Sequence, residues 1–227
     1  MGYGIKVRVW GDYACFTRPE MKVERVSYDM LTPSAARGII EAIYWKPAIK
    51  WTIDKIHVIN PIKFTNIRRN EVSEVAKLSS IKKAMDKGES YQIIATDNRH
   101  QRAALILRNV EYVIEAHFDL NLDKAGESDT VEKHYNIVMR RLKNGQFFYQ
   151  PTLGIREFAA SFELIEQEAD IPKSNISGEL DLGYMLYDLN FSVDKKKTKQ
   201  TVNPSFFRAK LKDGILDLQN VRNEVRI

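Results

Sequence analysis

The chain has 227 residues, of which 44% are hydrophobic, 29% charged and 10% aromatic, a composition typical of a globular protein with a proper core. Its formal net charge of +5 favours a polyanionic partner such as nucleic acid. The single cysteine, Cys15, excludes an internal disulfide and a cysteine-rich zinc site. With no signal-peptide pattern and no membrane-length apolar run, we expect a soluble, cytoplasmic protein without membrane contact.

The first sixty residues predict a strand, a helix and a second strand. Residues 5–10 alternate between apolar and polar side chains, as a half-buried strand does. Thr32 supplies a capping hydroxyl and Pro33 suits the first helical position, so a helix begins here. It must end before Pro47. The β-branched residues in the range 51–62 then predict the second strand.

The stretch from about residue 63 to residue 108 differs from its surroundings, because it is polar and strongly charged. We interpret it as an inserted β-hairpin with a mobile tip, turning near residues 86–88 and returning as a strand at 103–107. Residues 109–122 alternate so regularly that they predict the clearest strand of the chain. Its apolar face comprises Val110, Tyr112, Ile114, Ala116, Phe118, Leu120 and Leu122.

A second helix follows, with Asp129 as its expected N-cap, Glu132 completing a capping box, and Asn144-Gly145 at its end. Residues 158–165 predict the next strand. The order is therefore β-α-β-(insertion)-β-α-β, which is typical of an α+β, ferredoxin-like (RRM-like) domain. We expect this domain to span residues 1–165, with the insertion at about 63–108.

Residues 166–227 predict a small C-terminal antiparallel β-sheet domain. Its expected strands cover residues 185–193, 204–211 and 214–218. The basic sequence Lys-Lys-Lys-Thr-Lys at 195–199 lies between the first two strands. It is either solvated charge or a contact for a phosphate backbone.

The pair Lys133-His134 stands in the opening turn of the second helix, where free N–H groups and the helix dipole attract phosphate. It is either a solvated helix start or part of an RNA-cleaving site. RNA can be cut without a metal if the 2′-OH attacks the adjacent phosphate, with histidine as base or acid and lysine stabilising charge. In a ferredoxin-like fold both helices cover one sheet face, so Tyr44, at the end of the first helix, can approach this pair.

Metal and cofactor chemistry finds no support in the sequence. The four histidines are scattered without metal-ligand spacing, so we predict no metal site. No glycine-rich phosphate loop matches the P-loop spacing, and no cofactor is implied. We expect His57, His100 and His117 to be structural or surface residues. Trp45 and Trp51 are expected in the core rather than as base-stacking platforms.

Four blocks of sequence follow one another along the chain: Gly-Asp-Tyr-Ala-Cys-Phe at 11–16, Glu-Ala-Ile-Tyr-Trp-Lys-Pro at 41–47, Lys-His-Tyr at 133–135 and Leu-Gly-Ile-Arg-Glu at 153–157. In this order they resemble the Cas-five-d family of type I-C CRISPR systems, which belongs to the repeat-associated RNA-binding (RAMP) superfamily. The resemblance spans about residues 1–165 and is looser in the insertion and the C-terminal part. The pairing of Tyr-Trp-Lys-Pro with Lys-His-Tyr is far more specific than either alone.

The resemblance implies a metal-independent endoribonuclease that cuts the repeat hairpin of precursor CRISPR RNA and leaves a 2′,3′-cyclic phosphate and a 5′-hydroxyl. It implies that the protein then stays on the 5′ handle, beside the backbone and large subunits of the interference complex. The family's catalytic residues fall on Tyr44, Lys133 and His134.

Contacts to RNA are expected from Lys46, Gly154 and Arg156. Arg156 is expected to contact phosphate beside Gly154, where the missing side chain allows a close approach. Two alternatives stay open. In the first, the protein is a non-catalytic subunit that caps the RNA handle. In the second, it is a subunit that binds duplex DNA, because a basic surface attracts DNA as well as RNA.

Overall fold

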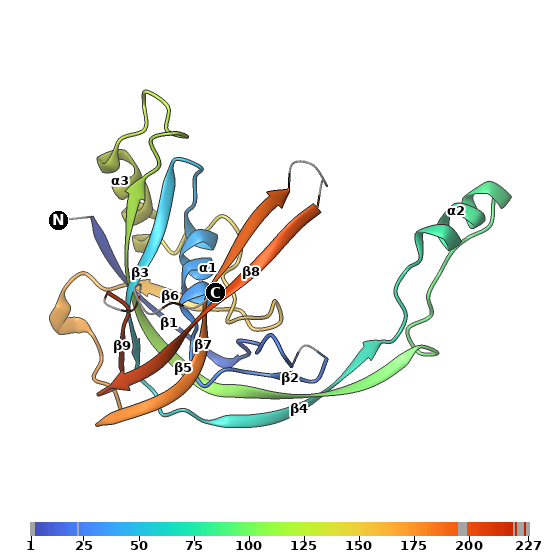
Figure 1. The fold of residues 1–227 in the computed structure, drawn as a ribbon, viewed down its shortest axis with the longest axis horizontal. Helices are drawn as coiled ribbons and strands as arrows, with labels where there is room; N and C mark the ends of the chain where they lie inside the picture. Colours follow the sequence, from blue (N-terminus) through green and yellow to red (C-terminus); the bar gives the residue numbers. More distant parts are fainter. Residues whose placement is uncertain (1–2, 22, 195–198, 220, 222–224, 226–227) are drawn as a thin grey trace.

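The computed structural model describes residues 3–21, 23–194, 199–219, 221 and 225. Within these residues the chain forms one nine-stranded sheet with three α-helices, so the predicted α+β class is confirmed (Figure 1). The elements are β1 (Gly4–Ala14), β2 (Arg25–Val26), α1 (Pro33–Ile43), β3 (Ile49–Val58), β4 (Phe64–Val72), α2 (Leu78–Lys87), β5 (Arg99–Leu120), α3 (Val131–Lys143), β6 (Ser161–Leu164), a 3-10 turn at Glu168–Asp170, β7 (Glu179–Asp194), β8 (Lys199–Lys212) and β9 (Ile215–Asp217).

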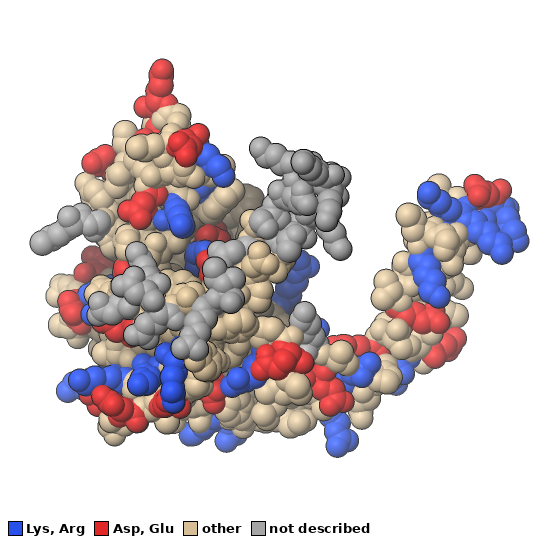
Figure 2. Space-filling view, in the orientation of Figure 1, with Lys and Arg blue, Asp and Glu red and all other residues tan. Residues whose placement is uncertain are grey.

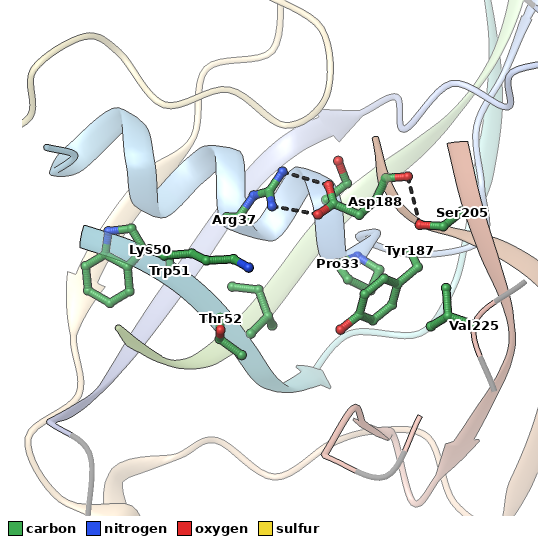
Figure 3. A pocket seen from close by; sticks show the side chains of 11 residues that line it. Pro33, Arg37, Lys50, Trp51, Thr52, Tyr187, Asp188, Ser205 and Val225 are labelled. Atoms are coloured by element: carbon green, nitrogen blue, oxygen red, sulfur yellow. Dashed lines mark hydrogen bonds and ion pairs between the residues drawn. The ribbon is translucent and has the colours of Figure 1, made fainter. Parts of the chain in front are cut away.

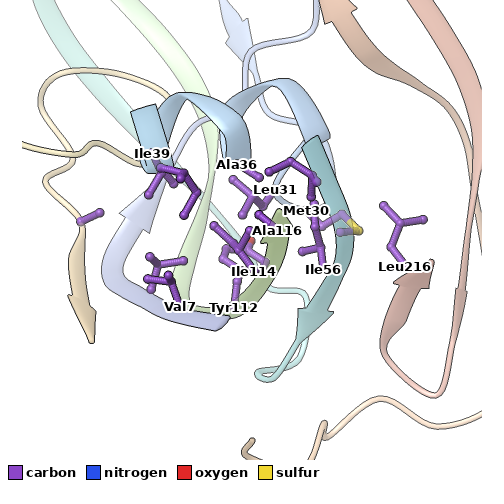
Figure 4. Packing of buried hydrophobic residues seen from close by; sticks show 14 of the residues in the cluster. Val7, Met30, Leu31, Ala36, Ile39, Ile56, Tyr112, Ile114, Ala116 and Leu216 are labelled. Carbon is purple, nitrogen blue, oxygen red and sulfur yellow. The ribbon is translucent and has the colours of Figure 1, made fainter. Parts of the chain in front are cut away.

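Strands β6, β1, β5 and β3 lie side by side in that order, and each neighbouring pair is antiparallel. With α1 after β1 and α3 after β5, this is the β-α-β-β-α-β connectivity that the hydrophobic pattern predicts. Apolar side chains of the sheet and of α1 fill the space between them, including Val7, Ile39 and Ile114 (Figure 4). The sheet therefore carries α1 and α3 side by side, which positions their termini.

Helix α1 begins and ends where its sequence dictates. Thr32 Oγ1 accepts a hydrogen bond from the N–H of Ala35, and Pro33 occupies the first turn. The helix ends at Ile43, and Tyr44 already has extended backbone angles. Its buried residues recur at helical spacing, so the apolar stripe faces the sheet. Because the last turn of the helix is buried against the sheet, the position of Tyr44, the next residue, is fixed.

The insertion is a β-hairpin, as predicted, but a helix caps its tip. Strands β4 and β5 pair from Phe64 to Val72 and carry α2 away from the body of the molecule (Figure 1). The turn expected at residues 86–88 is the end of α2, where Gly88 adopts φ 67°. Leu78, Ile81 and Met85 recur at helical spacing, but the polar, charged composition of the stretch led to its interpretation as a hairpin tip, and Ala84 is the only buried residue of the helix. Figure 2 shows Lys and Arg side chains at this tip, next to Asp and Glu.

The C-terminal strands continue the main sheet. β9 pairs with β3 and β8, and β8 pairs with β7 along their whole length, so the sheet order runs on as β3-β9-β8-β7. The domain boundary after residue 165 stays a prediction, and the hairpin β7–β8 is joined to the body by shared strands rather than by a linker. Residues 195–198 of the predicted basic loop lie outside the described residues.

Several predicted element boundaries are wrong. The strand expected at 51–62 already ends at Val58, and the strand expected at 158–165 spans only Ser161–Leu164. Two further differences lie between β5 and α3. The long strand ends at Leu120, and Leu122 is 81% exposed because the chain leaves the sheet one residue after Leu120. The N-cap of α3 is Thr130 and not Asp129, since Thr130 Oγ1 accepts a hydrogen bond from the N–H of Lys133. Asp129 precedes the cap by one residue, and its carboxylate accepts from the Gly126 N–H. In the parts of the chain that the structure describes, no helix is long and apolar enough to cross a bilayer.

Candidate active site

Tyr44 and His134 meet between the end of α1 and the start of α3. The Tyr44 hydroxyl lies 2.7 Å from His134 Nδ1, ninety residues away in the chain. The Tyr44 carbonyl accepts a hydrogen bond from the indole N–H of Trp51, which fixes the backbone beneath the ring. The approach that the fold predicted for these two side chains is present as a direct hydrogen bond.

Both side chains are buried, and burial controls their protonation. Tyr44 and His134 are each 2% exposed. Burial raises the pKa of Tyr44, so its hydroxyl keeps its proton at neutral pH. Burial also lowers the pKa of His134, although the nearby Asp129 carboxylate partly opposes this. The imidazole is therefore neutral near pH 7, with one nitrogen that donates and one that accepts.

His134 Nε2 faces the carboxylate of Asp129. It is a buried nitrogen with no hydrogen-bond partner among the described residues, and Asp129 Oδ1 lies 3.4 Å from it. The same carboxylate oxygen lies 3.0 Å from Lys133 Nζ. One Asp129 oxygen thus occupies the point where the lysine and the histidine converge, next to the positive end of α3. The carboxylate favours the tautomer with the proton on Nε2, which leaves Nδ1 to accept from Tyr44.

Further positive charge surrounds this point. Lys133 Nζ also donates to the Ser128 carbonyl at 3.1 Å, so the ammonium is held over the loop before α3. The exposed Lys46 adds a charge that lowers the pKa of His134. Arg141 lies over the Tyr44 ring at 5.1 Å and donates to the Ile43 carbonyl. The site can hold an anion and move a proton through a neutral imidazole.

Gly154 and Arg156 lie near the end of β1, whereas His134 lies near its start. The Phe118 ring packs against His134, and the residue before it, His117, pairs with Gly4 at the start of β1. Gly154 instead packs against Cys15, which follows the last residue of β1. Arg156 is exposed nearby. Their roles toward RNA stay predictions, and an RNA that contacts them and His134 must extend along the strand.

The other predicted histidine roles follow from strand pairing. His57 Nε2 contacts the Glu115 carboxylate at 2.6 Å, and His117 Nδ1 contacts the Asp54 carboxylate at 2.7 Å. Both pairs bridge β3 and β5, so they support the sheet. Within the described ranges, no group of three or more His, Cys, Asp or Glu side chains could hold a metal ion.

Sequence reasoning missed two features near the site. Trp51 is buried as expected, but Trp45 is 52% exposed, because the chain turns outward immediately after Tyr44. A pocket of about 480 Å³ also opens between α1, β3 and the β7–β8 hairpin (Figure 3). There Arg37 donates two hydrogen bonds to the Asp188 carboxylate, at 2.6 and 2.7 Å. None of the three predicted catalytic residues lines this pocket.

Comparisons with known proteins place the chain among CRISPR-associated proteins. The family model Cas_Cas5d, described as "CRISPR-associated protein (Cas_Cas5)", matches residues 4–219. A protein of Mannheimia succiniciproducens is 48% identical over 224 residues, covering 96% of each chain. A protein of Thermus thermophilus is 37% identical, covering 94% of this chain and 90% of the relative. Both relatives are named "CRISPR pre-crRNA endoribonuclease Cas5d".

The fold also matches solved structures. A structure titled "Crystal Structure of CRISPR-associated Protein" aligns with a TM-score of 0.69 over 99% of this chain and 96% of its own, at 24% identity. At this identity the match concerns the fold alone. It shows that the fold extends over nearly the whole length of both chains.

Proposed function

Because the chain belongs to the Cas5d (Cas-five-d) family of CRISPR-associated proteins, we propose that it is an endoribonuclease that cuts the repeat hairpin of precursor CRISPR RNA. The hydrogen bond between Tyr44 and His134, next to Lys133, carries this proposal. The protein then keeps the 5′ handle and works in the cytoplasm with the backbone and large subunits of a type I-C interference complex.

The proposed reaction is attack of a 2′-OH on the adjacent phosphate, without a metal ion. The oxygen–phosphorus bond to the 2′ oxygen forms while the bond to the 5′ oxygen breaks, giving a 2′,3′-cyclic phosphate and a 5′-hydroxyl. Lys133 stabilises the charge of the phosphorane, because its ammonium stands at the helix N-terminus where the phosphate binds. The 2′-OH loses a proton and the departing 5′ oxygen gains one. His134 accepts the first proton or supplies the second, solvent water exchanges the other, and Tyr44 holds Nδ1 of His134.

Access to His134 requires a local movement. With only 2% of the residue exposed and Asp129 in front of Nε2, a phosphate reaches the imidazole only when the carboxylate moves aside. The carboxylate and the phosphate are both anions, so they compete for Lys133 and for the N-terminus of α3. Repeat RNA therefore displaces Asp129 as it binds.

Two substrates and one chelator test the proposal. The protein is incubated in excess EDTA with its cognate repeat RNA, and in parallel with the same RNA carrying a 2′-deoxy nucleotide at the cut site. We expect the first RNA to be cut and the second to remain intact, with a 2′,3′-cyclic phosphate on the upstream product. Loss of cleavage in EDTA would falsify the metal-free reaction.

The burial of Tyr44 and His134 favours a second candidate, a subunit that caps the RNA handle without cutting it. In that case the repeat RNA binds but stays intact whether or not EDTA is present. Binding of duplex DNA by the basic surface is measured in the same assay with an unlabelled DNA competitor. DNA that displaces the RNA at equal concentration indicates a duplex-binding role.

Replacing Asp129 with asparagine tests the electrostatics of His134. The carboxylate raises the pKa of His134, so Asp129→Asn lowers that pKa. If neutral His134 acts as base, the acidic limb of the cleavage rate moves to lower pH; if protonated His134 acts as acid, the alkaline limb moves to lower pH. The sign is the same for both roles. We expect a shift to lower pH in the profile of kcat/KM, because this profile reports the free protein, in which Asp129 still faces His134.

Asp123→Asn is the matched control for this experiment. It changes the same charge on the same loop, and Asp123 is not among the groups that influence the pKa of His134. Its rate profile should coincide with that of the unchanged protein. An Asp129→Asn profile that does not move, or that moves to higher pH, contradicts the proposed environment of His134.

A further inference from the structure

Three aromatic side chains beside Tyr44 are exposed, although large apolar rings are usually covered. Trp45 is 52% exposed, Phe148 75% and Tyr149 59%. Phe148 and Tyr149 belong to the segment after α3, ninety residues and more from Trp45 in the chain. Exposed apolar surface that gathers at one place commonly marks a binding site.

Backbone hydrogen bonds join this segment to the candidate active site. The N–H groups of Phe148 and Tyr149 both donate to the Ala42 carbonyl, at 2.9 and 3.3 Å. Ala42 stands two residues before Tyr44, in the last turn of α1. The segment is therefore held in place by its main chain, and its rings remain free to contact a partner.

The rings present open faces. Phe148 and Tyr149 contact each other edge to face, with centroids 5.4 Å apart and planes at 65°, so the contact covers one face of one ring and leaves the other faces of the pair uncovered. Phe147, by contrast, packs against Phe162 of β6, and this contact anchors the segment. Lys46 is exposed immediately after Trp45, and Arg140 is exposed on α3.

We propose that Phe148 and Tyr149, which are held at the end of α1, form a stacking platform for unpaired RNA bases next to the phosphate that is cut, and that the exposed Trp45 at the same helix end adds to it. The inference rests on the proposed function, because it takes the Tyr44–His134 pair as the place of cleavage. Open aromatic faces flanked by cations recognise single-stranded nucleic acid by base stacking and backbone contact. The platform positions the substrate and takes no part in proton transfer.

Fluorescence and affinity measured with an uncleavable repeat RNA test the platform independently of catalysis. A set of 2′-deoxy-blocked repeat RNAs carries 2-aminopurine at one unpaired position each, and stacking on a ring quenches that base. We expect Phe148→Leu to lower RNA affinity by about tenfold and to relieve the quenching at one position, because leucine keeps the apolar bulk but has no π face. Phe148→Tyr should restore both.

Phe191→Ala is the matched control, since it removes an aromatic residue that is 59% exposed but lies on β7. It should leave affinity and quenching unchanged. Unchanged RNA affinity in both Phe148→Leu and Tyr149→Ala overturns the platform, and if assembly with other complex subunits is lost instead, the rings form a protein interface. Binding is measured with uncleavable RNA, so this test does not depend on cleavage. A protein that binds the blocked RNA through these rings but does not cut the unmodified repeat RNA refutes the nuclease and leaves the platform standing.

Discussion

His134→Ala should lower the single-turnover cleavage rate by about 10²- to 10⁴-fold while binding to uncleavable RNA changes little. The residue supplies the only imidazole that reaches both the Tyr44 hydroxyl and the point held by Lys133, among the residues that the structure describes. Its loss removes a group that exchanges protons near neutral pH. The rate is measured with limiting repeat RNA, and affinity with the 2′-deoxy form.

Burial makes a structural explanation of such a loss the main competitor. His134 is 2% exposed, so its removal leaves a small cavity and an unpartnered Tyr44 hydroxyl, which together reduce stability. Two measurements separate the explanations. Added imidazole should fill the cavity and restore part of the rate, and thermal unfolding reports the stability loss directly. A rate that falls only in proportion to the unfolded fraction contradicts the catalytic role.

His117→Ala provides the matched control for this variant. His117 also joins two elements through Nδ1, here by a 2.7 Å contact with the Asp54 carboxylate, but it bridges β3 and β5 instead of the two helices. We expect its cleavage rate to stay within a few-fold of the unchanged protein at a temperature where both are folded. Equal losses in both variants indicate that sheet stability, not proton transfer, limits cleavage.

The sequence predicted the central fold because its periodicity is clean. The alternation from Val110 to Phe118 and the helical stripe of α1 each define one buried face, and these faces fix the order of strands and helices. Once that order is known, the end of α1 and the start of α3 must be neighbours. The meeting of Tyr44 and His134 was therefore predictable from topology alone.

Features that depend on the exact loop path were not predictable. The N-cap of α3 is Thr130 and not Asp129, and this difference of one residue places the Asp129 carboxylate in front of His134. The loop sequence is compatible with either residue as the N-cap. The exposure of Trp45 likewise depends on a turn outward after Tyr44. Helix α2 is a different case, because Leu78, Ile81 and Met85 recur at helical spacing. That signal was present in the sequence and was outweighed by the polar, charged composition of the insertion.

Gly154→Ala should be among the most destabilising single substitutions outside the hydrophobic core. A Cβ at this position would lie 2.0 Å from the Cys15 carbonyl oxygen and 2.6 Å from its carbon, both backbone atoms that cannot rotate away. The residue also has φ 92°, a conformation that side chains other than glycine rarely adopt. We expect a loss of about 2–5 kcal/mol in unfolding free energy, from backbone strain and overpacking together.

Gly183→Ala isolates the conformational part of this cost. Gly183 has φ 72°, but nothing lies within 4 Å of the position that its Cβ would take. Its substitution should therefore cost about 1 kcal/mol, well below the cost at Gly154. Denaturant unfolding of both variants measures the difference.

The same pair of variants tests what Gly154 contributes to RNA binding. Glycine at position 154 permits a close approach of the backbone, and the segment that approaches is the protein's own chain at Cys15. Next to Gly154, the Leu153 carbonyl accepts a hydrogen bond from the Cys15 N–H at 3.0 Å. If that contact is the reason for glycine, folded Gly154→Ala protein at low temperature should bind repeat RNA with unchanged affinity. Normal stability combined with a large affinity loss would instead support direct contact between Gly154 and RNA, as expected from the sequence.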